Sequence, residues 1–137
     1  MTQTLVVHSG AALDWALARE PERLGPIFND LATLRALAPD IYAYEIADGL
    51  LAGARSGGLT EAAQARMADA IFALPITVIA LEPDAIRRRL AQTAHRLDIA
   101  VVDAAYLDLA EREQASLLAL DPALREAAQD AGVPLAV

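Results

Sequence analysis

The stretch ITVIALEPDAIRRRLAQTAHRL, residues 76–97, contains the clearest change of pattern in the chain. Its beginning, 76–81, is apolar and rich in β-branched side chains, which predicts a strand buried within a sheet. Pro83 then suits the first turn of a helix, and the apolar residues Ile86, Leu90 and Leu97 predict that this helix runs to about residue 97. A strand followed directly by a helix is the repeating unit of a parallel sheet.

The same alternation of strand and helix extends along the 137 residues. Short β-rich or apolar runs predict strands at 4–7, 76–81, 116–120 and 134–137, and either a short strand or an extended approach at 99–102. Apolar residues at helical spacing, bounded by caps and breakers, predict helices at 11–19, 21–37, 41–54, 60–73, 83–97, 103–113 and 121–131. We therefore predict an α/β fold with a mainly parallel sheet, in a single domain that spans residues 1–137.

The composition predicts a globular protein without a membrane segment. Apolar residues make up 55% of the chain, and the longest apolar stretch, Ile71–Leu81, is interrupted by Pro75 and Thr77. This stretch falls short of the ~20 residues that are needed to span a bilayer. No positively charged segment precedes the first apolar run, so we see no signal peptide and expect a cytoplasmic location.

The residue types that are missing narrow the possible chemistry. The chain has no cysteine, and all 11 of its basic residues are arginine. Thiolate zinc sites, Schiff-base lysines and P-loop lysines are therefore excluded, which leaves carboxylate, imidazole, hydroxyl and guanidinium groups. The net charge of −8 argues against tight binding of long duplexes. It does not exclude a small nuclease with one local arginine patch and a bound cation, and it suits a basic protein partner.

Four residues at the ends of apolar runs or in the first turns of helices could carry chemistry: His8, Glu45, Asp103 and Asp121. Loops and helix starts at the carboxyl ends of parallel strands are where α/β sheets build their sites. Three carboxylates that converge there would repel one another unless a cation lay between them. Three of the four also have a purely structural interpretation. Asp103 would complement a helix dipole, Asp121 before Pro122 would cap a helix, and His8 would be a hydrogen-bonded strand end.

Several further residues have alternative interpretations. Asp48 lies one helical turn after Glu45, so the two acids form either a ligand pair or a solvated stripe. The three arginines 87–89 lie between two apolar positions, which favours a solvated face over contacts with phosphate. Trp15 and Phe28 are expected in the core, and His95 is expected on the surface.

Five consecutive blocks of the sequence resemble those of a PIN domain. They are LVVHSGAALDWAL, APDIYAYEIADGLLAGARSGGLTEAA, ALPITVIAL, DIAVVDAAYLDLAERE and SLLALDPALREAAQDAGV, and together they cover nearly the whole chain in order. The sequence is most similar to the VapC-type toxins of bacterial toxin–antitoxin pairs. The resemblance implies a three-layer α/β/α sandwich around a parallel sheet, a homodimer, and cleavage of RNA with Mg²⁺ or Mn²⁺.

The resemblance also implies which residues carry the chemistry. Four acids hold the metal in this family, and the matching positions are Glu45, Asp103 in the D-A-x-Y-L pattern with Tyr106, and Asp121. His8 stands where the first acid belongs and is therefore a candidate fourth ligand. The implied products are RNA ends with a 5′-phosphate and a 3′-hydroxyl group.

Two supporting positions depart from the family pattern as well. Ala119 stands where the T-x-D motif has its threonine, and Gly10 stands where a hydroxyl side chain follows the first acid. Mg²⁺ prefers oxygen ligands, whereas imidazole is a softer ligand that suits Zn²⁺ or Fe²⁺. Replacing a carboxylate with neutral His8 therefore predicts weaker Mg²⁺ binding.

Three consequences of that replacement are open. The site could use a softer metal through His8, or it could keep weak Mg²⁺ activity through its three acids. Alternatively, catalysis is lost, and the chain is a PIN-fold module that binds an antitoxin-like protein or RNA.

Overall fold

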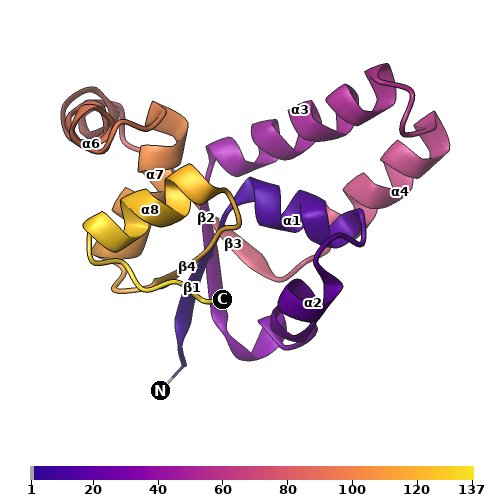
Figure 1. Ribbon diagram of the computed structural model, residues 1–137, viewed down its shortest axis with the longest axis horizontal. Coiled ribbons are helices and arrows are strands. Elements are labelled where there is room, and N and C mark those ends of the chain that lie inside the picture. Colours follow the sequence, from indigo (N-terminus) through magenta and orange to yellow (C-terminus); the bar gives the residue numbers. More distant parts are fainter. Residues whose placement is uncertain (1) are drawn as a thin grey trace.

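A computed structural model describes residues 2–137 as an α/β protein built on a parallel sheet (Figure 1). The strands of this sheet are β1 (Thr4–Val7), β2 (Arg35–Pro39), β3 (Ile76–Ile79) and β4 (Ser116–Leu118). Their spatial order is β3-β2-β1-β4, and each neighbouring pair is parallel. The predicted fold class is confirmed, with β1 and β2 in the middle of the sheet.

Alternate residues of the central strands enter two separate cores, one on each face of the sheet. Leu5 and Val7 pack into one core, whereas Val6 and Leu37 pack into the other. The parallel register pairs Leu5 with Ala36 and Val6 with Leu37, so the alternation is kept from one strand to the next. Because both faces are covered, the protein is a three-layer α/β/α sandwich.

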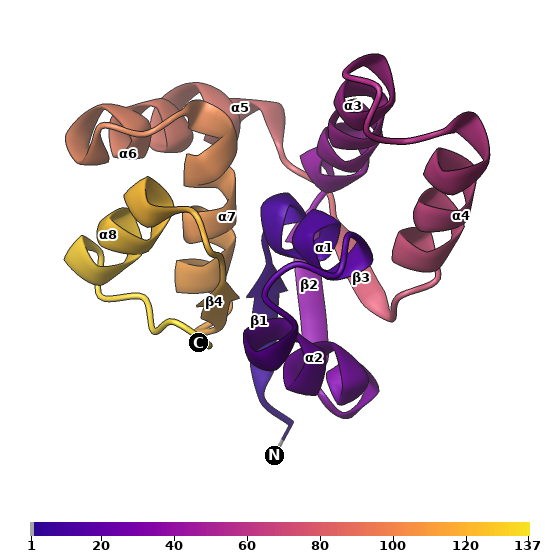
Figure 2. The same ribbon diagram turned by 45° about the vertical axis from the view of Figure 1, so that its right-hand side comes forward.

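Helices from the first half of the chain cover one face of the sheet, and helices from the second half cover the other (Figure 2). The first group contains α1 (Ser9–Ala16), α2 (Pro21–Asn29), the 3-10 turn η1 (Leu31–Thr33), α3 (Ile41–Arg55) and α4 (Glu61–Phe72). The second contains α5 (Pro83–Ala85), the π-helical turn η2 (Ile86–Leu90), α6 (Ala91–Leu97), α7 (Val101–Arg112) and α8 (Pro122–Asp130). The segment from α5 to α6 packs on α7 through its own small core.

The predicted helix over 21–37 is wrong in its second half. Helix α2 ends at Asn29, and residues 35–39 form the central strand β2. The letters RALAP favour a helix by intrinsic propensity, because alanine, leucine and arginine are good helix formers. Burial on both faces between β1 and β3 outweighs that preference, as Ala36, Leu37 and Ala38 are all buried.

Three predicted strands also need correction. The strand at 76–81 forms over Ile76–Ile79, but it is an edge strand rather than a buried one, and Val78 is 48% exposed. Of the two alternatives for 99–102 the short strand is wrong, because α7 already begins at Val101, while Ala100 before it is extended. The strand predicted at 134–137 is reduced to an isolated bridge between Leu117 and Leu135.

The predicted core aromatics lie together beside the sheet. Phe28 is buried, and the half-buried Trp15 stacks on it with ring centroids 5.0 Å apart. His95, Arg88 and Arg89 are exposed as predicted, while the side chain of Arg87 lies outside the described residues. No helix within residues 2–137 is long and apolar enough to cross a membrane.

Candidate metal centre

Three of the four predicted site residues meet at the carboxyl edge of the parallel sheet. His8 follows β1 directly, Glu45 lies in the second turn of α3 after β2, and Asp103 lies in the first turn of α7. Each offers one potential ligand atom, and these atoms lie within 4.8 Å of one another. The meeting point is set by the topology, since the segments that leave β1 and β2 emerge at the same edge.

The imidazole of His8 makes two hydrogen bonds with opposite roles. As the N-cap of α1, its Nδ1 accepts a hydrogen bond from the backbone N–H of Gly10 at 3.2 Å. An accepting Nδ1 carries no proton, so Nε2 is the protonated nitrogen of the neutral ring. Nε2 then donates to Oδ1 of Asp103 at 3.1 Å. The His8 side chain is only 12% exposed, and that of Asp103 is 26% exposed.

Glu45 is held by a buried tyrosine from the opposite face of the sheet. The hydroxyl of Tyr106 donates to Oε1 of Glu45 at 2.6 Å. Burial raises the pKa of Tyr106 above its usual range, and the hydrogen bond to Glu45 raises it further, so the phenol stays neutral. The same ring contacts His8 edge-on, with centroids 4.6 Å apart. Tyr106 therefore fixes both the carboxylate and the imidazole.

Asp121 lies outside this group of three. It is the N-cap of α8, and its Oδ2 accepts a hydrogen bond from the backbone N–H of Leu124 at 3.0 Å. Its side chain is exposed, and among residues 2–137 the compact ligand group consists of His8, Glu45 and Asp103. The structural interpretation of Asp121 as a helix cap is therefore confirmed.

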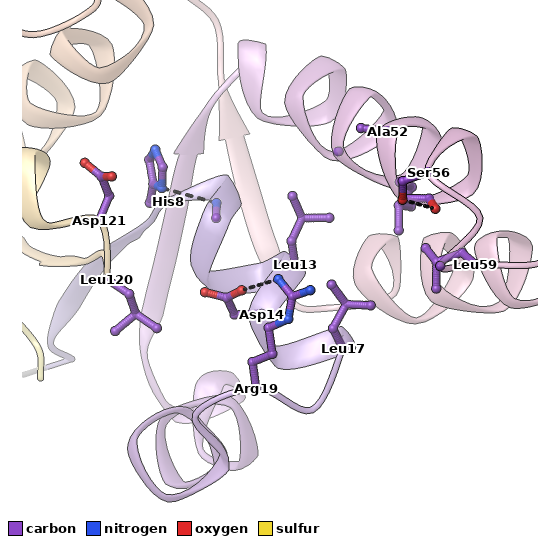
Figure 3. Close-up of a pocket in the computed structure, with 15 residues that line it drawn as sticks. His8, Leu13, Asp14, Leu17, Arg19, Ala52, Ser56, Leu59, Leu120 and Asp121 are labelled. Atoms are coloured by element: carbon purple, nitrogen blue, oxygen red, sulfur yellow. Dashed lines mark hydrogen bonds and ion pairs between the residues drawn. The ribbon is translucent and has the colours of Figure 1, made fainter.

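A cavity of about 650 Å³ opens beside the group, between α1 and α3 (Figure 3). His8 and Asp121 line one end of it, and an ion pair between Asp14 and Arg19, with 3.6 Å between Oδ1 and Nη1, lies further along the wall. The cavity is large enough for a ligand of small-molecule size. Asp121 thus shares the cavity with His8 without joining the ligand group.

Sequence reasoning missed one buried acid, Asp108 on α7. It is 5% exposed, and its carboxylate accepts hydrogen bonds from Arg89 on η2 and from Arg112 one helical turn along α7. The i,i+4 spacing of Asp108 and Arg112 was a visible signal, but the partner from η2 is distant in sequence. Asp48, the acid one helical turn after Glu45, is exposed and does not join Glu45 in the ligand group.

The donor set fits a hard divalent cation through its carboxylates. Glu45 uses Oε1 for Tyr106, and Asp103 uses Oδ1 for His8, so each acid keeps its second oxygen free of these two contacts. Carboxylate oxygens are the ligands that Mg²⁺ and Mn²⁺ prefer. With His8 neutral, the group carries a formal charge of −2, which one divalent cation balances.

Comparisons with known proteins bear on the fold alone. No family model matches the sequence, and no curated protein matches it. Among solved structures, the chain is similar to PAE2754 from Pyrobaculum aerophilum, with a TM-score of 0.70 and 19% sequence identity. The similarity covers 93% of this chain and 86% of that one. It therefore extends to the whole three-layer arrangement and identifies no activity.

Proposed function

We propose that this chain is a divalent-metal-dependent endoribonuclease of the PIN-domain, VapC-like class. The observation that carries the proposal is the convergence of Glu45 and Asp103, together with His8, at the carboxyl edge of the strands. These are the positions at which the sequence resembles that family. Paired carboxylates are what metal-assisted hydrolysis of a phosphodiester needs, and His8, the third member of the group, lines the cavity.

Each residue has a defined role in this proposal. Glu45 and Asp103 would hold Mg²⁺ or Mn²⁺ through their free oxygens. The bound cation would activate a water molecule and neutralise charge that develops on the phosphate. Tyr106 and His8 keep the two carboxylates in place by donating one hydrogen bond to each. Asp121 would act from the cavity wall, on water or substrate, rather than from within the ligand group.

Removal of either carboxylate tests the proposal. Glu45→Gln and Asp103→Asn should each reduce RNA cleavage more than ~100-fold, beyond the loss typical of residues behind the ligands. Asp48→Asn is a matched control, because this acid lies on the same helix but is exposed and outside the group. Cleavage that persists at the parental rate in both site variants would refute the proposal.

The proposed partners follow from the proposed ribonuclease function. RNA is the substrate, and a small basic antitoxin-like protein would neutralise the toxin in the cytoplasm. The net charge of −8 supports a basic partner. A homodimer is supported by the large apolar side chains that the single chain leaves exposed, among them Tyr44 at 81%, Phe72 at 52% and Val78 at 48%.

A second candidate function is binding without catalysis, by the same PIN-like fold. The observation that favours it is the hydrogen bond from His8, which satisfies Asp103 without any cation. Cleavage of RNA by the parent and by His8→Asp, side by side in Mg²⁺ and in Mn²⁺, separates the two. A parent that cuts supports the ribonuclease, whereas cleavage by the variant alone supports the binding module.

A further inference from the structure

The two hydrogen bonds of His8 constrain its protonation state together. The N–H of Gly10 is one of the first in α1 and has no carbonyl partner within the helix, so the helix end depends on Nδ1 as an acceptor. A proton on Nδ1 would point at that N–H. Nδ1 therefore carries no proton as long as the cap is kept, which leaves Nε2 as the nitrogen that carries one.

A flipped ring does not offer an alternative. Rotating the imidazole by half a turn would put carbon atoms where Nδ1 and Nε2 now lie, and both hydrogen bonds would be lost. The edge contact with Tyr106 and the low exposure of His8 also hold the plane of the ring. A single orientation and a single tautomer thus satisfy Gly10 and Asp103 at once.

A ring nitrogen that carries a proton has no lone pair for a cation. For Nε2 to become a ligand, the proton would have to move to Nδ1, and the cap of α1 would break. We propose that His8 is a positioning residue whose Nε2–H orients Asp103, and that cation coordination in this chain uses oxygen atoms only. The metal half of this inference rests on the proposed function, whereas the tautomer half does not.

Nuclear magnetic resonance of the full chain, labelled with ¹⁵N in histidine and with ¹³C in the carboxyl groups of aspartate and glutamate, tests the inference. Without metal, His8 should show an unprotonated Nδ1 and a protonated Nε2, and this pattern should persist when saturating Mg²⁺ or Zn²⁺ shifts the carboxyl resonances of Glu45 and Asp103. The exposed His95, the second of the two histidines, serves as an internal control. A proton on Nδ1, or loss of the Nε2 proton when metal binds, would overturn the inference.

The variant His8→Asn separates positioning from ligation. Asparagine can still cap α1, but its side chain is too short to reach Asp103 as the imidazole does. We expect the Asp103 carboxyl resonance to move and the affinity for Mg²⁺ and for Zn²⁺ to fall by a similar factor of about 10. A collapse of Zn²⁺ affinity alone would show that His8 is a ligand and would overturn the inference.

Failure of the proposed function looks different. If neither cation shifts the carboxyl resonances of the parent, the metal-dependent ribonuclease is refuted. The tautomer of His8 and the response of the Asp103 resonance in His8→Asn then still decide whether His8 positions Asp103.

Discussion

Replacing His8 with aspartate turns a hydrogen-bond donor into a third negative charge. The ligand atoms of His8, Glu45 and Asp103 lie within 4.8 Å of one another. Two unit charges at that separation repel by about 3 kcal/mol at an effective dielectric constant near 20, and this is an upper bound for the variant because the aspartate side chain is shorter than the imidazole. Solvent reaches Asp103, whose side chain is 26% exposed, and proton uptake gives further relief, so we expect a net loss of roughly 1–3 kcal/mol in the free energy of unfolding at neutral pH.

Proton uptake sets the direction of the pH dependence. Repulsion from the two neighbouring carboxylates raises the pKa of the introduced aspartate in the folded variant above its unfolded value of about 4. A carboxyl group whose pKa is raised in the folded state leaves the free energy of unfolding unchanged below its unfolded pKa. It lowers that free energy most above its folded pKa. The free energy of unfolding of the variant should therefore match that of the parent only below about pH 4, and it should drop below the parent's as the pH rises toward 7.

Thermal unfolding with and without Mg²⁺ measures both effects. For a chain of this size, 1 kcal/mol corresponds to roughly 4 °C in Tm, so the metal-free His8→Asp variant should melt about 4–12 °C below the parent at neutral pH. Mg²⁺ should raise the Tm of the variant more than that of the parent, because it binds the folded state through one more carboxylate. His8→Asn, which adds no charge, is the matched control. This reasoning would be refuted if the metal-free variant had the same Tm as the parent and Mg²⁺ did not raise it.

Two further substitutions probe the supports of the site. Tyr106→Phe removes the hydroxyl that donates to Glu45, so it should lower the free energy of unfolding by about 1–2 kcal/mol. In a calorimetric titration it should also weaken Mg²⁺ binding about tenfold. An unchanged Mg²⁺ affinity would contradict the role given to Tyr106. Asp108→Asn should lower the free energy of unfolding, measured by chemical denaturation, by about 1–2 kcal/mol. This is less than the 3–5 kcal/mol typical of breaking a fully buried pair, because both arginine partners are more than 40% exposed. A loss in the higher range would contradict this reasoning and show that the arginines depend fully on this acid.

The parts of the fold that the sequence predicted were those with strong local signals. The helix starts at Thr60 and Asp121 were visible as caps, and the structure shows both side chains accepting a backbone hydrogen bond three residues on. Strand β2 was missed, because its five residues carry no β-branched side chain and become a strand only through pairing on both sides. That information lies in β1 and β3, not in the segment itself.

The candidate site divides in the same way. Glu45 was predicted from its place in an apolar helical stretch and from the resemblance, although strand β2 before it was missed. Asp103 was predicted as an acid in the first turn of a helix, which is where it lies in α7. The hydrogen bond from Tyr106 to Glu45 joins residues 61 positions apart, so no local pattern indicates it. For Asp121 the local cap signal and the resemblance predicted different roles. In the structure its carboxylate accepts a hydrogen bond from the backbone N–H of Leu124, as a helix cap does.

The two donors explain how this group of side chains can be ordered without a cation. Two carboxylates within 4.8 Å would repel each other in a partly buried setting, yet each here receives a hydrogen bond from a neutral group, the imidazole of His8 or the phenol of Tyr106. Such bonds to charged groups stabilise by about 1.5–3 kcal/mol each, comparable to the repulsion between the acids. A third carboxylate in place of His8 would remove one donor and add two repulsive pairs. The histidine therefore favours a site that is ordered without metal, at the expense of the strength with which it would hold one.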